Sequence, residues 1–502
     1  MIDHKRSFYI FFIIVFVLFL TTGCGKQPEL EKVTILYWND FHASFNPYPS
    51  SDDPGSPLVS GSAYFSSWLD SLKEKSENCV LVCAGDELVG TPLSTLTSGK
   101  AEFEILNRIK PDIFELGNHE FDYGLDNLKS LIDFAEFPII CANVVEQKTG
   151  EPLVLPYLIL KRGKAKIAFM GLNTEDLKEE VVEKGTLGLK VGSAKKTCQK
   201  YLGLLEKEAD LIVLVSHMGF SKDKEVAQEV KGIDVIIGGH SHTRLIYPEV
   251  INQTVICQAG SKGRYIGKLD LVFDLEKERL INFENRLIET ENSKVSPDRA
   301  IQRKVDSLEK KLAPDLDKVI GTLLSPWIRS SKGESNLYNW TADVIREYTK
   351  SDVAFINSGA LRKNLPAGSI TIRDIWEINP FSDHFVSFHL TGEELLDVLE
   401  KNSSGYLLMQ VSGIEYSYDP QKPEGERIFE VSVNGIPLLP KKNYKVAIND
   451  YMLDHLENYI GKPKEEIACR IYPDLDRDVY IRAVKKQKRI DSEVEGRIKR
   501  KK

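Results

Sequence analysis

Short runs of apolar residues recur at wide spacing through the first half of the chain. Several of them are apolar throughout, which is typical of strands in a sheet that is covered on both faces. We interpret as buried strands residues 33–38, 79–85, 112–117, 138–143, 166–172, 211–217 and 234–240. Helical periodicity separates them at 62–77, 125–136 and 194–209. This alternation predicts an α/β fold in which helices cover a layered sheet.

The pattern changes twice further along the chain. Three runs, at 254–260, 264–275 and 279–288, are predicted to be antiparallel strands that close the first domain. Residues 291–320 are charged and helical, with an interruption at Pro314, and we expect them to be a linker helix. A second α/β unit follows, with helices expected at 336–350 and 391–402 and strands at 352–359, 427–435 and 443–450. We therefore expect domains at 33–290 and 321–485.

The N-terminus has a different character from the rest. A charged start precedes an apolar run from Phe8 to Leu20, and its 13 residues are fewer than the roughly 20 that cross a bilayer. We interpret residues 1–24 as a signal peptide and 25–32 as a tether. The pair Gly23-Cys24 resembles a bacterial lipoprotein processing site, which implies a lipid on Cys24 and an extracytoplasmic protein anchored to a bacterial membrane. The alternative is a plain secretory signal with an incidental cysteine.

The length, net charge and cysteine content of the chain limit the kinds of function it can have. The chain has 502 residues and a net charge of −8 without a basic surface pattern, which argues against a nucleic-acid binder. The basic end, residues 486–502, is expected to be a solvated tail. The six cysteines after Cys24 form no close pair with metal-ligand spacing, and we interpret them as small buried residues. One long-range disulfide stays possible in an exported protein. We expect a monomer.

The histidines of the first domain all lie where predicted strands end. In open α/β sheets, ligands bind at the carboxyl ends of the strands. The five are His42, His119, His217, His240 and His242, and the oxygen-bearing side chains beside them are Asp40, Asp86, Asn118 and Asp122. This mixture of imidazole and oxygen suits Zn, Mn, Co or Fe and does not suit Ca or Mg. So many candidate ligands indicate two metals about 3.5–4 Å apart, with a carboxylate such as Asp86 as the bridge.

Five segments, NDFH, GDELVGTP, GNHEFD, SHMG and GGHSH, occur in this order between Asp40 and His242. They resemble the signature blocks of calcineurin-like metallophosphoesterases, in the branch of the 5'-nucleotidases and UDP-sugar hydrolases. The resemblance implies a four-layer α/β/β/α sandwich. It also implies two divalent metals: one held by Asp40, His42 and His242, the other by Asn118, His217 and His240, with Asp86 between them.

The same resemblance gives the remaining residues of these segments their roles. His119 would stabilise the transferring phosphoryl group and protonate the leaving oxygen. Asp122 would orient His119; its alternative is a turn-forming aspartate without a catalytic role. Glu120 is interpreted as a surface residue or a support for the ligands.

The second half resembles the substrate-binding C-terminal domain of the same branch, on the segments GESNLYNWTADVIRE and residues 352–383. The resemblance implies substrate contacts by Asn357, Arg362, Phe381 and Tyr451, with the two aromatic rings stacking on a nucleobase. For Phe381 the alternative is a core residue. The family's Gly-Gly-Asp-Gly turn after the second aromatic is absent, since this chain reads LDHLENYIG. Its early arginine has two candidates, Arg329 and Lys332.

Three functions follow from these residues. The first is a lipid-anchored, extracytoplasmic metallophosphatase that hydrolyses 5'-nucleotides and also nucleotide-sugar pyrophosphates. The second keeps the metals on the same scaffold but acts as a cyclic-nucleotide phosphodiesterase or a thiosulfohydrolase, which the missing Gly-Gly-Asp-Gly turn favours. The third is a surface lipoprotein that binds a ligand and has lost catalysis, which the intact set of predicted ligands opposes. His384, His389 and His455 are expected to be structural or surface residues.

Overall fold

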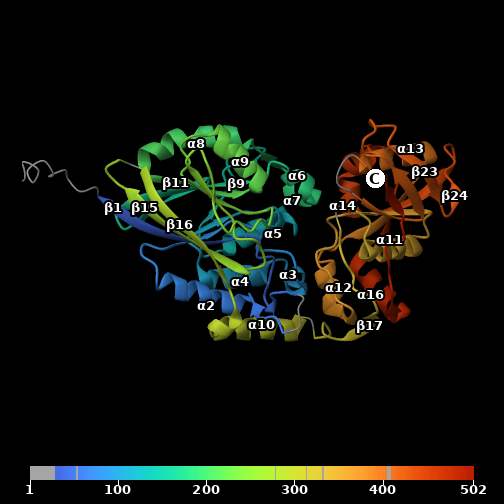
Figure 1. The fold of residues 1–502 in the computed structure, drawn as a ribbon, viewed down its shortest axis with the longest axis horizontal. Coiled ribbons are helices and arrows are strands. Elements are labelled where there is room, and N and C mark those ends of the chain that lie inside the picture. The colour runs from blue at the N-terminus through green and yellow to red at the C-terminus, as the bar shows by residue number, and fades with distance from the viewer. Residues whose placement is uncertain are drawn as a thin grey trace, which may run out of the picture.

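The computed structural model describes residues 29–51, 55–277, 279–312, 314–330, 333–403 and 409–501. The chain forms two α/β halves that follow one another in sequence, with the first on the left of Figure 1 and the second on the right. The predicted signal peptide (1–24), its lipidation site Cys24 and the first half of the tether (25–28) lie outside the described residues, as does Lys332. Within the described part of the chain, no helix has the length and apolar character to cross a membrane.

Two six-stranded sheets make up the first half. The first sheet has the order β16-β15-β1-β4-β5-β6, formed by β16 (Arg279–Glu289), β15 (Tyr265–Asp274), β1 (Leu30–Trp38), β4 (Val80–Cys83), β5 (Ile113–Glu115) and β6 (Ile139–Ile140). The second has the order β13-β14-β12-β11-β9-β8, formed by β13 (Glu249–Ile251), β14 (Thr254–Cys257), β12 (Val235–Gly238), β11 (Leu211–His217), β9 (Ala165–Asn173) and β8 (Tyr157–Arg162).

Alternation along the strands explains why the sheets stack. Successive side chains of a strand point to opposite faces. In β1, Ile35 and Tyr37 join the core between the two sheets, whereas Leu36 and Trp38 pack under helices. The helices on that outer face are α2 (Ser62–Lys73), α4 (Lys100–Ile109) and α5 (Leu125–Phe134), and those on the outer face of the second sheet are α8 (Ala194–Glu208) and α9 (Phe220–Glu229). The expected four-layer α/β/β/α sandwich is therefore confirmed (Figure 1).

One predicted pairing is wrong. We expected 254–260 to be an antiparallel closing strand, but β14 runs parallel to β12. The reason is β13, which lies between β12 and β14 in sequence and pairs antiparallel with β14 at the edge of the sheet. The chain therefore reverses twice after β12. The other two predicted closing strands, β15 and β16, are antiparallel as expected.

The linker helix packs on the first half. It is α10 (Arg299–Leu312), which ends two residues before Pro314. Ile301 and Val305 of this helix join a small core with Ala63 of α2 and Ile105 of α4.

The second half contains a five-stranded sheet, a four-stranded sheet and a three-stranded sheet. The five-stranded sheet has the order β21-β18-β25-β20-β26, formed by β21 (Met409–Ser412), β18 (Val353–Asn357), β25 (Asn443–Asn449), β20 (His384–Thr391) and β26 (Arg470–Leu475). Its main helices are α11 (Asn336–Thr349), α12 (Ile372–Ile378), α13 (Gly392–Asn402) and α16 (Asp476–Gln487). The two halves touch where Thr95 of α3 (Pro92–Thr97) donates a hydrogen bond of 3.0 Å to the carbonyl of Pro380.

The expected solvated tail at 486–502 is wrong for the residues that the structure describes there. β27 (Arg489–Ile490) pairs with β17 (Val319–Leu323), and β28 (Ile498–Arg500) pairs with β22 (Ile414–Tyr418) of the four-stranded sheet. The positive charge of this segment is partly buried and compensated, since Arg497 is 7% exposed and its Nη2 lies 2.7 Å from Asp343 Oδ2. Basic composition alone did not distinguish edge strands from a free tail.

The cysteines follow the expectation with two exceptions, Cys79 and Cys469. The six in the described part of the chain are all free, and four of them are buried: Cys83, Cys141, Cys198 and Cys257. Cys79 is partly exposed. Cys469 is exposed, because it lies in the loop just before the edge strand β26.

Candidate metal centre and active site

The candidate site lies where the carboxyl ends of parallel strands from both sheets of the first half meet. Asp40 follows β1 by two residues, and Asp86 follows β4 by three. Asn118 follows β5 by three residues, His217 is the last residue of β11, and His240 follows β12 by two. The stacking of the two sheets therefore brings five short loops together at one edge of the sandwich.

Backbone strain is concentrated in these loops. Five of the seven predicted metal ligands have a positive φ: Asp40 (52°), His42 (49°), Asp86 (58°), His240 (71°) and His242 (53°). This left-handed region is unfavourable for residues other than glycine, and such residues cluster at functional sites, where the surrounding structure holds them in place.

The first group of predicted ligands is compact. The Nε2 atoms of His42 and His242 lie 2.9 Å apart. His242 Nε2 lies 3.3 Å from Asp40 Oδ1, and His42 Nε2 lies 3.9 Å from the same oxygen. The backbone N–H of His240 donates to both carboxylate oxygens of Asp40, at 3.1 and 3.0 Å, which fixes the orientation of that carboxylate.

The second group lies beside it. His217 Nε2 is 3.2 Å from Asp86 Oδ2, and His240 Nδ1 is 3.0 Å from Asn118 Oδ1. Asp86 Oδ2 is also 3.9 Å from His42 Nε2, so this carboxylate lies between the two groups. The geometry thus gives Asp86 the position that a bridging ligand requires.

The chemistry of these donors fits cations. Three sets of side chains have ligand atoms within 4.8 Å of one another: Asp40 with His42 and His242, His42 with Asp86 and His119, and Asp86 with His217 and His240. The Nε2 of His217 is buried; Asp86 Oδ2 lies 3.2 Å away, but the two atoms do not have the geometry of a good hydrogen bond. Its Nδ1 lies 2.6 Å from the carbonyl of Ala84. A backbone partner on one ring nitrogen is the usual arrangement behind a metal-binding imidazole.

The electrostatics of His217 support the same conclusion. Burial disfavours the charged imidazole, but Asp86 outweighs it and raises the pKa of His217 to about 10. The surroundings of His217 therefore favour positive charge at its Nε2, which either a proton or a metal cation can supply.

His119 lies at the rim of this cluster and pairs with Asp122. Its Nδ1 lies 2.6 Å from Asp122 Oδ2, and its backbone N–H donates to Asp86 Oδ1 at 2.9 Å. Burial acts to lower the pKa of His119, but Asp86 and Asp122 together outweigh it, so the pKa is raised from its ordinary value. These two carboxylates therefore stabilise the protonated form of the imidazole that faces the cluster.

Glu120 has a larger structural part than the sequence suggested. It is fully buried, and its carboxylate accepts four backbone hydrogen bonds, from the N–H groups of Asp86 (3.0 Å), Glu87 (2.8 Å), Leu88 (3.2 Å) and Gly117 (2.6 Å). This side chain ties the loop after β4 to the loop after β5. The interpretation of Glu120 as a surface residue is wrong; the alternative, a support for the ligands, agrees with its position.

Gly117 allows the two loops to approach this closely. A Cβ at this position would lie 2.2 Å from Asp86 Oδ1 and 2.5 Å from Asp86 N. No other residue fits without displacing that carboxylate.

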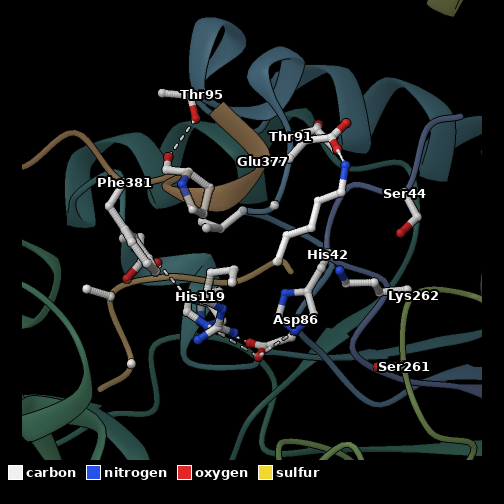
Figure 2. A pocket seen from close by; sticks show the side chains of 18 of the residues that line it. His42, Ser44, Asp86, Thr91, Thr95, His119, Ser261, Lys262, Glu377 and Phe381 are labelled. Atoms are coloured by element: carbon white, nitrogen blue, oxygen red, sulfur yellow. Dashed lines mark hydrogen bonds and ion pairs between the residues drawn. The ribbon is translucent and has the colours of Figure 1, made fainter. Parts of the chain in front are cut away.

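A large cleft of about 2140 Å³ connects the cluster with the second half of the chain (Figure 2). Its walls include the four predicted substrate residues, Asn357, Arg362, Phe381 and Tyr451, and one of the two candidates for the early arginine, Arg329. Pockets for drug-sized ligands measure about 300–1,000 Å³, so this cleft has room well beyond a single nucleoside monophosphate.

Two of the four predicted substrate residues lie next to His119. Arg362 Nη2 is 3.4 Å from His119 Nε2, and the ring centroids of Phe381 and His119 are 6.3 Å apart. The guanidinium carbon of Arg362 is 5.9 Å from the centre of the Phe381 ring. Phe381 is only partly buried, which leaves a face of its ring in the cleft.

The other two substrate residues are held by protein contacts. Asn357 is 7% exposed, and its Oδ1 accepts a hydrogen bond of 3.2 Å from Asn449. The hydroxyl of Tyr451 donates to the carbonyl of Glu179 in the first half, at 3.1 Å. His455, expected to be structural, makes a similar contact, since its Nε2 lies 3.0 Å from the carbonyl of Val181.

One residue of the cleft was missed by sequence reasoning. Lys262 lies in the loop between β14 and β15, and its backbone N–H donates to the carbonyl of Asp40 at 2.7 Å. Burial, reinforced by nearby cations, lowers the pKa of its ammonium to about 8. A lone lysine in a loop has no spacing or motif that could have identified it.

Comparison with known proteins agrees with the order of the two halves. The family model of calcineurin-like phosphoesterases matches residues 33–244, and the model of the 5'-nucleotidase C-terminal domain matches residues 319–462. The chain is 25% identical to the trifunctional nucleotide phosphoesterase protein YfkN of Bacillus subtilis over 94% of its own length and 35% of that relative. It is 27% identical to a 5'-nucleotidase of Vibrio vulnificus, covering 87% of this chain and 88% of that one.

The chain spans about a third of the length of the first two curated relatives that it matches, at 35% and 37%. Among solved structures, the 5'-nucleotidase precursor of Thermus thermophilus superposes with a TM-score of 0.86 at 24% identity. That match covers 94% of this chain and 99% of the other, and it shows that the two share the fold.

Proposed function

We infer that this chain, which belongs to the calcineurin-like metallophosphoesterases that carry a 5'-nucleotidase C-terminal domain, is a dinuclear-metal phosphohydrolase that releases phosphate from 5'-nucleotides. One observation carries the proposal: six of the seven predicted ligands form groups with ligand-atom spacing at one edge of the sandwich, and the seventh, Asn118, lies 3.0 Å from His240. The His119–Asp122 pair lies beside them, and Arg362 of the second half lies next to His119. Matched relatives named as nucleotide phosphoesterase and 5'-nucleotidase support the substrate class.

The ligands divide between two sites. Asp40, His42 and His242 would hold one divalent cation, and Asn118, His217 and His240 the other, with Asp86 shared between them. Imidazole nitrogen mixed with oxygen suits Zn, Mn, Co or Fe. Held by these residues, such cations would supply positive charge for the phosphoryl oxygens and would make a water molecule more acidic.

His119 is the proposed acid. Its raised pKa keeps the imidazolium form populated at neutral pH, so a proton is available at Nε2 for the oxygen that leaves phosphorus. Asp122, at 2.6 Å from Nδ1, holds the ring in one orientation and compensates its charge. Without the carboxylate, burial would favour the neutral ring, which is a much weaker acid than the imidazolium.

Arg362 adds positive charge beside the position proposed for the reacting phosphoryl group. Its guanidinium lies 3.4 Å from His119 Nε2, where it can donate hydrogen bonds to a phosphoryl oxygen that enters between them. Since phosphoryl transfer asks a protein mainly for positioning and charge compensation, these two side chains supply what the chain itself must contribute.

The second half supplies the proposed nucleoside site. Phe381 offers a ring face in the cleft for stacking on a base, a contact that contributes about 1–3 kcal/mol. Tyr451 is the second proposed aromatic, and Asn357 the proposed hydrogen-bonding group for the base or ribose. The contact of Tyr451 with Glu179 ties this part of the second half to the first half.

An extracytoplasmic location, a lipid on Cys24 and a monomeric state belong to this proposal as well. They rest on the sequence pattern of residues 1–24 and on the composition.

A second candidate is an enzyme with the same metals and a different substrate, either a cyclic-nucleotide phosphodiesterase or a thiosulfohydrolase. The missing Gly-Gly-Asp-Gly turn at LDHLENYIG favours it, because the ribose then lacks the aspartate that grips it in the family. A vestigial surface binding protein is the third, and the convergence of all seven ligands counts against it.

The test uses the chain from residue 25 with added Mn, Zn or Co. Phosphate release is measured from AMP and UMP. The first cleavage products are measured from the other substrates: UMP from UDP-glucose, adenosine monophosphate from 2',3'-cyclic AMP and p-nitrophenol from bis-p-nitrophenyl phosphate, with thiosulfate esters as a separate arm. Turnover of AMP or UMP above the diesters supports the nucleotidase. Turnover confined to the diesters or to the sulfur substrate supports the second candidate, and turnover of nothing in the panel rejects both enzymes.

A further inference from the structure

Asn449 ends the central strand of the five-stranded sheet, between the two strands that lead into the proposed nucleoside site. It is the last residue of β25, which runs parallel to β18 and antiparallel to β20. β18 ends at Asn357, and β20 begins at His384, directly after Asp383. The ends of β18 and β25 therefore meet the start of β20 at one edge of the sheet. This topology places the buried side chain of Asn449, which is 4% exposed, between two segments of the cleft wall.

The amide of Asn449 is engaged at both of its ends. Its Oδ1 accepts the backbone N–H of Met452 at 3.1 Å and so caps the helix α14 (Asp450–Asp454). Its Nδ2 donates to Asn357 Oδ1 at 3.2 Å and to Asp383 Oδ2 at 2.9 Å. A side-chain amide has two N–H donors, so each donor of Asn449 has one acceptor here. One side chain therefore joins three segments that are separate in the sequence.

Each of these three segments carries a predicted substrate residue. Asn357 is one itself, Phe381 lies two residues before Asp383, and Tyr451 belongs to α14. The segment of Phe381 is also held from its other side, because Arg477 Nη1 donates to the carbonyl of Phe381 at 2.8 Å. A change in the position of Asp383 is therefore passed on to the aromatic ring through a short and restrained piece of chain.

The hydrogen bonds of Asn449 also determine which end of the Asn357 amide faces the cleft. The backbone N–H of Met452 can only donate, so the atom of Asn449 that faces it is the oxygen, and the nitrogen of Asn449 faces Asn357. This nitrogen requires an oxygen as its partner. Asn357 Nδ2 then lies on the other side, 3.7 Å from the place that a Cβ of Gly359 would take, and Gly359 lines the cleft as well.

We propose that Asn449 is a positioning residue of the nucleoside site. It fixes Asn357, the segment of Phe381 and the start of α14 relative to one another, and it turns the Asn357 amide so that Nδ2 is the group presented to the substrate. The nucleoside group that Asn357 binds is then a hydrogen-bond acceptor, such as a ring nitrogen or a carbonyl oxygen of the base. Asn449 acts through these neighbours, since its own amide is fully engaged. This inference rests on the proposed phosphohydrolase function.

Two substitutions separate the amide of Asn449 from its role as a helix cap. Asn449→Asp and Asn449→Ser both keep an oxygen that can cap α14, because aspartate and serine are about as favourable as asparagine at this position. Neither of them keeps the two N–H donors of the amide. The matched control is Asn443→Asp, since Asn443 begins the same strand and is exposed. The melting temperature of each variant, measured by calorimetry, shows that it is folded.

The kinetic test compares AMP with ribose 5-phosphate, which lacks the base. The ratio of kcat/KM for AMP to that for ribose 5-phosphate should fall at least tenfold in Asn449→Ser and stay within about twofold of the wild type in Asn443→Asp. Asn357→Ala should lower the same ratio, and the double variant should lose less than the product of the two single losses, because Asn449 acts partly through Asn357. An unchanged ratio in Asn449→Ser, or a double loss equal to the product, would contradict the proposal.

A binding experiment separates this inference from the proposed function. Adenosine and inorganic phosphate are titrated calorimetrically into the metal-loaded chain. Adenosine should bind Asn449→Asp and Asn449→Ser at least tenfold more weakly than the wild type and Asn443→Asp, whereas the affinity for phosphate should change less than twofold. This outcome supports the inference even if no nucleotide is hydrolysed. Wild-type affinity for adenosine in either Asn449 variant, an equal loss for adenosine and phosphate, or a wild type that does not bind adenosine would overturn it, even if AMP hydrolysis is found.

Discussion

The carboxylate of Glu120 offers the sharpest test of how the fold holds the metal centre. One of its oxygens accepts the N–H groups of Glu87 and Leu88, and the other accepts those of Asp86 and Gly117. Glu120→Gln keeps the shape of the side chain but replaces one oxygen with an amide NH₂. Two backbone donors then face a donor instead of an acceptor, at the position where the loop after β4 presents its carboxylate to the cluster.

The magnitude follows from these contacts. A buried donor that loses its acceptor costs about 1–3 kcal/mol, so two such donors cost about 2–6 kcal/mol. For a domain of this size, 1 kcal/mol shifts the melting temperature by about 2–4 °C, which gives a fall of at least about 4 °C. Burial and the nearby Asp86 raise the pKa of Glu120 to about 7, whereas its backbone donors favour the carboxylate form. The comparison is therefore made at pH 8, where the wild-type group is ionised.

The assay measures the melting temperature by calorimetry, the bound metal by elemental analysis and kcat/KM on AMP, in the same preparations. Glu120→Gln should lower all three, with kcat/KM down at least tenfold, because the predicted bridging carboxylate moves. The control is Glu136→Gln, at a side chain that is 63% exposed and pairs with Lys110, which should shift the melting temperature by less than 1 °C. A Glu120→Gln variant within about 0.5 kcal/mol of the wild type, with full metal content, would refute the reasoning.

Three further results are expected. Gly117→Ala should lower metal content and reduce activity more than tenfold, because its Cβ would lie 2.2 Å from the oxygen of the predicted bridging carboxylate. The control is Gly203→Ala, in a helix with open space around the new Cβ, which should change neither the metal content nor the activity. Asp122→Asn should lower kcat and move the alkaline limb of the pH–rate profile to lower pH, because the Asp122 carboxylate helps to raise the pKa of His119. Without that carboxylate, His119 loses its proton at a lower pH. An unchanged profile would show that Asp122 does not have its proposed role. Removing residues 498–502 should lower the melting temperature by several degrees in a calorimetric scan, because it deletes β28 and its hydrogen bonds to β22, at about 1 kcal/mol each. If this segment were a free tail, the melting temperature would not change.

The sequence predicts the sandwich, and the gathering of the candidate site residues at one edge of it, because both depend on local patterns. Continuous apolar runs such as 211–217 form strands that are buried on both faces, and the residue that ends each run then lies at the sheet edge. The pattern of apolar runs alone therefore assigns His217 and Asp40 to the same edge. The order of the strands in the two sheets could not be predicted from these local patterns, since it depends on pairing between strands that are far apart in the sequence.

The incorrect predictions have a common physical origin. The parallel pairing of β14 depends on a short edge strand that precedes it, and the folded end of the chain depends on partners about 80 to 170 residues earlier. Glu120 looks like any polar residue of a turn, and only the tertiary structure shows four backbone donors around it. Lys262 belongs to no motif, and only the tertiary structure shows that its backbone bonds to the carbonyl of Asp40.

The most direct test of the central claim is the metal content of the purified chain from residue 25, measured together with phosphate release from AMP, in the wild type and in Asp86→Ala. A dinuclear phosphohydrolase predicts about two metal ions per wild-type chain and metal-dependent turnover of AMP, with both lost or reduced at least tenfold in Asp86→Ala. An Asp86→Ala variant that keeps the full metal content and the full rate would contradict the dinuclear site.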